Sequence, residues 1–222
     1  MNLSTRAKNS LVFNTEDESE RDENGLFRHR DTYNASMQFS AILRTLTGEC
    51  QLALTQWMHA FDALHRRTRA NMSVQETVST SVLWLGYTVL YTLFARDFSK
   101  GEMGYDVYAQ DFDNALSHAL VAIRHHHRHS SQQQNRQQMF SLGLGIMSSL
   151  YFVAIKCRHR SVKDMALYAL SAAPLQEGLW NRDSAFLMTR VLVEMEEKFR
   201  IPGTVGPEGI PVEARIIGVN FC

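Results

Sequence analysis

The chain has 222 residues, 45% of them hydrophobic, and its 23 basic residues balance its 23 acidic residues to a formal net charge of zero at pH 7. That length suits one domain with a sizeable core, and the neutral charge lacks the basic excess that characterises nucleic-acid-binding proteins. The three cysteines, Cys50, Cys157 and Cys222, lie far apart in the sequence. They predict neither a disulfide framework nor a zinc site, and we interpret them as reduced thiols.

The N-terminal segment, residues 1–26, is polar and carries six acidic residues between positions 16 and 23. Because few of its residues are apolar, it cannot bury enough surface to fold alone, and we predict a disordered acidic tail. It lacks the interleaved aromatic residues of acidic activation segments, which favours a solvated tail over that alternative. No apolar core follows the first charges, so we expect no signal peptide. Residues 27–222 are predicted to form one domain.

Helical spacing of apolar residues begins near Tyr33. We expect Gly48 to end this helix and a second, longer helix to reach about Arg69. The basic end of that helix, residues 65–69, complements the helix dipole and requires no ligand. A nuclear-localisation or phosphate-binding segment is the alternative.

Ser73 followed by Glu76 is a capping box, which predicts the start of an apolar helix. The apolar run over residues 82–95 contains Gly86 and Thr88 and is short for a membrane span. We therefore predict a buried helix of the core and no membrane contact.

A loop is predicted over residues 96–104 and a helix from Tyr105, which leads to a cluster of four histidines at positions 125–127 and 129. A metal site would use His125 and His129, which share a helix face, and an acidic third ligand. No carboxylate of suitable spacing is nearby, so a polar connector between two helices is favoured and no metal or cofactor is predicted.

Three further helices are predicted between residues 140 and 199. The first, over residues 142–155, is apolar around most of its circumference and should be buried. Ser161 with Asp164 resembles a capping box that starts the second helix. A turn that contains Gly178 follows, and Asn181 can cap the third helix.

The C-terminal residues 201–209 are rich in glycine and proline, and residues 214–221 alternate weakly between apolar and polar. We expect this tail to be strand-like or irregular. Together these segments predict an all-α fold, a single array of about seven helices with a disordered acidic N-terminus.

Several short motifs resemble the fungal-specific transcription factor domain, the helical region that follows a zinc binuclear cluster in many fungal regulators. The resemblance covers residues 27–221, and Glu196–Glu197 and the segment 211–215 belong to it. The residues that carry it most clearly are Trp57, Phe61, Lys156, Cys157, Arg158, Glu177, Gly178 and Trp180.

The sequence departs from the family pattern in four respects. Lys163-Asp164 stands where a basic pair is usual, and Asn181 where an Asp often follows the Trp. His159 and Arg160 stand where an acidic residue and a proline usually follow the Cys-Arg pair, and the six closely spaced cysteines of the zinc-cluster module are missing. The resemblance therefore implies a regulatory region without its DNA-binding module, located in the nucleus, with the cytoplasm as the alternative. It implies control of metabolic or secondary-metabolite genes through protein partners, and an unknown small effector is compatible with it.

Two other functions stay open at this point. One is a helical interaction or scaffold protein without a role in transcription. The other is a metalloprotein that uses the histidine cluster.

Sequence motifs of common enzymes are missing: there is no phosphate-binding loop, no dinucleotide-binding glycine pattern and no Gly-x-Ser-x-Gly elbow. Cys157 and His159 are two residues apart, which does not orient a thiolate and a base. The cations beside Cys157 would lower the pKa of its thiol, but a small apolar residue packed under the turn is the favoured interpretation. We predict a non-enzymatic protein.

The Lys-Cys-Arg and Glu-Gly-Leu-Trp motifs are expected to form one structural clasp. In this hypothesis Glu177 pairs with Arg158 or Lys156, and Leu179 and Trp180 turn inward to anchor the junction between two helices.

We predict that this chain alone does not bind duplex DNA specifically, because it combines neutral charge with no recognisable reading module. A gel-shift assay at physiological salt should show no sequence-dependent complex. Nanomolar binding that depends on the DNA sequence would contradict the prediction.

Overall fold

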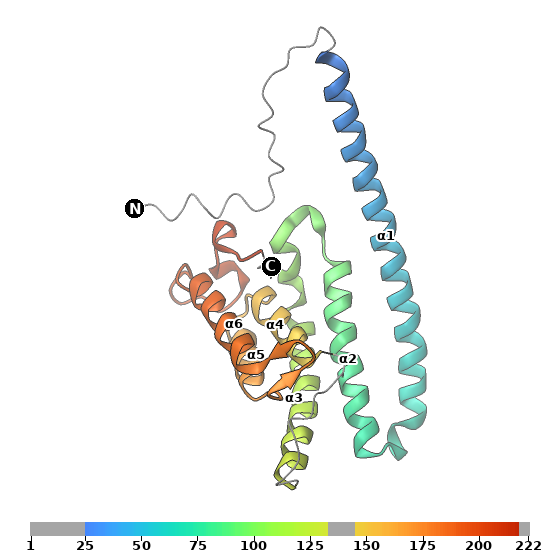
Figure 1. The fold of residues 1–222 in the computed structure, drawn as a ribbon, viewed down its shortest axis with the longest axis vertical. Helices are drawn as coiled ribbons and strands as arrows, with labels where there is room; N and C mark the ends of the chain where they lie inside the picture. The colour runs from blue at the N-terminus through green and yellow to red at the C-terminus, as the bar shows by residue number, and fades with distance from the viewer. Residues whose placement is uncertain (1–24, 133–144, 218–222) are drawn as a thin grey trace. The chain divides into compact units, whose positions relative to one another are not determined.

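The computed structural model describes residues 25–132 and 145–217 (Figure 1). Within these ranges its regular secondary structure is helical apart from one short antiparallel hairpin, which confirms the predicted all-α class, with six α-helices in place of about seven. The α-helices are α1 (Gly25–Thr68), α2 (Val74–Ala95), α3 (Ala109–Gln132), α4 (Ile146–Lys156), α5 (Arg160–Ser171) and α6 (Arg182–Glu197). The hairpin strands are β1 (Gln176–Glu177) and β2 (Trp180–Asn181), and 3-10 segments include η2 (Arg69–Asn71), η3 (Phe98–Tyr108), η4 (Pro207–Gly209) and η5 (Val212–Ala214).

The chain divides into two compact units, residues 1–46 and residues 47–222. In the first unit the structure describes residues 25–46, which are helical, so Gly25 and Leu26 of the predicted tail belong to α1. The rest of that tail, residues 1–24, lies outside the described residues, and the predicted domain boundaries stay a prediction. The second unit contains the core and everything discussed below.

Helix α1 continues through Gly48, so the predicted break at this residue is wrong. A glycine inside a helix costs only about 1 kcal/mol relative to alanine, which the surrounding helix formers offset. Gly48 is exposed, and a Cβ added there would meet nothing within 4 Å.

Helix α2 begins with the predicted capping box. The amide of Glu76 donates to Ser73 Oγ (3.2 Å), and the amide of Ser73 donates to Glu76 Oε2 (2.7 Å). The helix packs along α3 and buries Ser81, Leu85 and Thr92. Among the described residues, α2 has the length and the apolar composition that a membrane-spanning helix requires. Core helices of soluble proteins meet the same two criteria.

Helix α4 is the centre of the core and packs against α2, α3, α5 and α6. Its residues Met147, Leu150, Val153 and Ala154 have no exposed surface. This confirms the predicted buried helix, which begins at Ile146; residues 142–144 lie outside the described part.

The helices on either side of α4 begin at other residues than predicted. His159 precedes the first residue of α5, and the proposed Ser161–Asp164 box does not form, because Ser161 already lies in the first turn. Helix α3 begins at Ala109, after the 3-10 segment η3, and not at Tyr105. Asn181 caps α6 as predicted: its Oδ1 accepts from two amides, each at 3.1 Å.

The histidine cluster continues α3 and is not a connector. Nε2 of His127 lies 2.8 Å from the carbonyl oxygen of Ala172 and links the end of α3 to the end of α5. The side chain of His129 lies outside the described part of the structure. Among the described residues, no group of three or more His, Cys, Asp or Glu side chains is placed to hold a metal ion.

The C-terminal tail is irregular as far as residue 217, as one of the two predicted forms requires. It contains the short 3-10 turns η4 and η5 and no strand among its described residues. Residues 218–221, the rest of the expected strand-like segment, lie outside the described ranges.

A Gly48→Ala variant tests the continuity of α1. Alanine should raise the free energy of unfolding by about 0.5–1 kcal/mol, because it removes backbone freedom from the unfolded chain and meets no neighbour. Urea denaturation measures the change. The matched control is Gly178→Ala, which should lower stability because Gly178 has φ +56°, where L-residues are strained. Destabilisation by Gly48→Ala would contradict an uninterrupted helix.

Candidate functional site

A buried ion-pair network lies where α4, α5, α6, η3 and the C-terminal tail meet. Lys156 and Arg158, from the predicted Lys-Cys-Arg motif, stand at its centre and are both buried. Its inner members are three cations and three carboxylates: Lys156, Arg158, Lys163, Glu102, Glu196 and Glu197. At its edge Arg200 pairs with Glu197 and Arg96 approaches Glu102.

Arg158 connects two carboxylates from distant parts of the sequence. Its Nε lies 3.2 Å from Glu196 Oε1, and its second guanidinium nitrogen lies 2.9 Å from Glu102 Oε2. Two further hydrogen bonds go to the carbonyl oxygens of Lys156 (2.8 Å) and Ile216 (3.3 Å). These bonds offset the cost of removing the guanidinium from water.

Glu196 is the second centre of the network, and its side chain is only 1% exposed. One carboxylate oxygen accepts from Arg158 and from the amide of Ile216 (3.1 Å), and the other accepts from Lys163. The ammonium of Lys163 also reaches Glu197, at 2.9 Å. Helices α5 and α6 and the C-terminal tail are thereby fixed to the end of α4.

The carboxylates Glu102 and Glu197 are the partly exposed members of the network. Lys156 Nζ donates to both oxygens of Glu102 (2.8 and 2.9 Å), and burial lowers the pKa of this lysine despite those bonds. Burial alone would raise the pKa of Glu197, but hydrogen bonds from Arg200 and Lys163 outweigh it and hold that pKa at about 2. The contacts with Arg200 and Lys163 therefore keep the carboxylate of Glu197 ionised.

Cys157 is packed into the core and is only 2% exposed. Burial raises the pKa of its thiol to about 11. The neutral thiol behaves as a small apolar residue and is a poor nucleophile. This agrees with the packed residue that the sequence favoured over a reactive thiol.

The predicted pair of Glu177 and Arg158 does not form. The carboxylate of Glu177 accepts from the amides of Ile146 and Met147, both at 2.8 Å, and so caps the first turn of α4. Arg158 follows the other end of this helix, which is about 16 Å long at 1.5 Å per residue, beyond the reach of one carboxylate. Burial raises the pKa of Glu177 more than the two amide hydrogen bonds lower it.

Gly178 and Trp180 form the short turn that carries Glu177. Gly178 adopts φ +56°, and the strands pair Glu177 with Trp180. Trp180 is half-buried on the core, with its ring 5.6 Å from that of Tyr151. Leu179 is fully exposed, so its expected inward orientation is wrong. A two-residue turn cannot direct two successive side chains to the same side.

Trp57 and Phe61 lie in the contact between α1 and α2. Their rings stack at 4.7 Å, and each also meets a ring of α2, Tyr87 at 5.8 Å and Trp84 at 5.7 Å respectively. The ring of Trp84 also stacks on that of His118 of α3. This aromatic cluster is a packing feature, far in sequence from the network.

Sequence reasoning missed Glu102, although it contacts three cations. It lies between two glycines in a segment predicted as a loop, and no periodicity marks it. Other charged residues, Asp97, Lys100 and Asp106, stand close to it in the sequence, so no local signal singles it out or identifies a partner.

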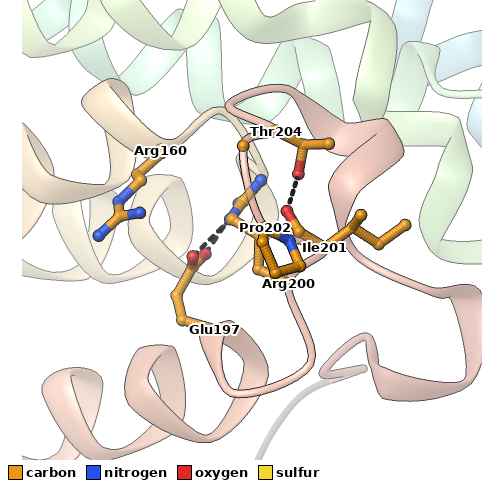
Figure 2. Close-up of a pocket in the computed structure, with 7 residues that line it drawn as sticks. Arg160, Glu197, Arg200, Ile201, Pro202 and Thr204 are labelled. Atoms are coloured by element: carbon orange, nitrogen blue, oxygen red, sulfur yellow. Dashed lines mark hydrogen bonds and ion pairs between the residues drawn. The ribbon is translucent and has the colours of Figure 1, made fainter.

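A shallow pocket adjoins the network at the end of α6 (Figure 2). Among its lining residues Glu197 pairs with Arg200, and Thr204 donates to the carbonyl of Ile201. Its volume of about 170 Å³ is below the roughly 300 Å³ at which small-molecule sites begin.

Comparisons of the chain with models of known protein families, with curated proteins and with solved structures found no match. The resemblance to the fungal transcription factor domain therefore stays a hypothesis based on the residues named above.

A Glu196→Gln variant tests whether the network holds the fold together. Glutamine keeps the shape but removes the charge that two buried cations require, so the free energy of unfolding should fall by about 3–5 kcal/mol. The matched control is Glu194→Gln on the same helix, which removes an exposed pair with Arg190 and should cost less than about 0.5 kcal/mol. Equal effects in urea denaturation would contradict the structural role of the network.

Proposed function

We propose that this chain is a non-enzymatic helical regulatory domain that controls transcription through contacts with other proteins, as its resemblance to the fungal-specific transcription factor domain implies. The genes under its control would be metabolic or secondary-metabolite genes, and its location would be the nucleus. Most residues that carry the resemblance, including Arg158 and Glu177, contribute to packing. This agrees with motifs that define a fold and leave the surface free for partners.

The observation that carries the proposal is an exposed apolar stripe on α6. It consists of Leu187, Val191, Met195 and, just beyond the helix end, Phe199, each between 44% and 62% exposed. Residues four apart form a ridge along a helix, and a second helix packs by fitting its own ridge into the groove beside it. The stripe therefore suits the apolar face of a partner protein's amphipathic helix.

The ion-pair network gives this stripe a fixed orientation. The opposite face of α6 is buried through Thr189, Val193 and Glu196, and Glu196 is bonded to Arg158 and Lys163. Because these bonds prevent α6 from rotating, its apolar stripe is held toward solvent. A preformed surface loses little entropy when a partner binds.

The proposal is tested by tethering the full chain to an unrelated DNA-binding module upstream of a reporter gene. We expect the tethered chain to change transcription severalfold relative to the module alone. Val191→Asp should abolish the change because it places a charge in the stripe. The matched control, Val107→Asp, alters an exposed valine of η3 and should have no effect.

Unchanged transcription by a folded, tethered chain would contradict the proposal and leave the interaction or scaffold alternative. Circular dichroism of both variants establishes folding. Zinc analysis of the purified chain decides the metalloprotein alternative separately.

A further inference from the structure

A second apolar stripe, on α1, is exposed in the part of the chain that the structure describes, and at its border the ring of Trp57 also stacks on Tyr87 of α2. It consists of Ala53, Trp57, Ala60 and Leu64, which are spaced four, three and four residues apart and are all exposed. This spacing places them on one side of a helix. We call them the α1 stripe.

The centre of the α1 stripe lies away from the face of α1 that packs on α2, and only Trp57 reaches both. That face holds the half-buried Leu54, Met58 and Phe61, and Gln51 donates from it to the carbonyl of Phe94 at 2.6 Å. At about 100° per residue the two faces lie roughly a third of a turn apart, with Trp57 at their border. A helix docked on the α1 stripe would therefore lie beside α2 without displacing it.

The α1 stripe is complementary to itself when read in the opposite direction. Along the chain its residues alternate small and large: Ala53, Trp57, Ala60, Leu64. An antiparallel second copy places each large residue opposite a small one, Trp57 against Ala60 and Leu64 against Ala53. A parallel copy would place Trp57 against Trp57 and leave gaps between the alanines.

The charges beside the α1 stripe select the same arrangement. Glu49 and Arg67 are both exposed, and neither makes an ion pair within the described ranges. They are separated by 18 positions in the sequence, which is five full turns at 3.6 residues per turn, so they lie on the same flank. In an antiparallel pair Glu49 of each copy meets Arg67 of the other.

We propose that two copies of this chain associate through antiparallel contact of their α1 stripes, with reciprocal Glu49–Arg67 pairs at the two ends. The interface is isologous, as in most homodimers. It involves about five helical turns of each copy and is small, so the dimer exchanges with monomer as concentration changes. This surface is independent of the α6 stripe and of the proposed role in transcription.

Sedimentation velocity of the full chain at about 10–500 μM, where small interfaces dissociate, tests the proposal. The expected result is a shift from monomer toward dimer with rising concentration. Ala53→Glu should abolish the shift, because it buries a charge in the interface. Thr55→Glu, the control, alters an exposed residue about half a turn away on α1 and should leave the shift unchanged.

Charge reversal tests the orientation. Glu49→Arg and Arg67→Glu should each weaken self-association, because each places like charges together at both ends. An equimolar mixture of the two variants should associate again, because both end pairs then become attractive. Circular dichroism confirms that each variant is folded.

Three outcomes would overturn the proposal: a full chain that stays monomeric throughout, a dimer that Ala53→Glu does not weaken, or a mixture no more associated than its components. Occupation of the α1 stripe by residues 1–24 would give the first of these.

Discussion

The bond between Arg158 and Glu196 is the contact on which the other helices depend. Both side chains are buried, and each has further partners: Glu102 for the arginine and Lys163 for the glutamate. Charges withdrawn from water are stable only when every one of them is matched, so the network accepts few other arrangements. Apolar packing would allow the helices to slide, whereas these bonds define one position for the ends of α4, α5 and α6.

Helix α4 is held at both ends by charges of the sign that its dipole favours. At its N-terminus Glu177 accepts the amides of Ile146 and Met147, and at its C-terminus the guanidinium of Arg158 donates to the carbonyl of Lys156. Negative charge at the start and positive charge at the end both stabilise a helix. The apolar helix α4 thus depends on two charged groups: Arg158, which directly follows it, and Glu177, which lies in a turn 30 positions after Met147.

The charged interior and the apolar surface have complementary consequences. Inside, the charged groups of the network are matched to one another, and Cys157 is a neutral, buried thiol. Outside, α1 and α6 each present apolar residues at helical spacing. Exposed apolar helix faces are typical of protein-interaction surfaces. In the two proposals made above, the α1 stripe would bind a second copy and the α6 stripe a different partner.

The sequence by itself determined the helical class, the burial of α4, the caps at Ser73 and Asn181 and the packed state of Cys157, because these follow from local spacing and from short-range hydrogen bonds. Only the tertiary structure decided the partners of the charged residues. Arg158 meets Glu102 and Glu196, which are 56 and 38 positions away in the sequence. Glu177 instead reaches the opposite end of α4. No local pattern encodes such pairs, since they depend on how helix ends converge once the core has formed.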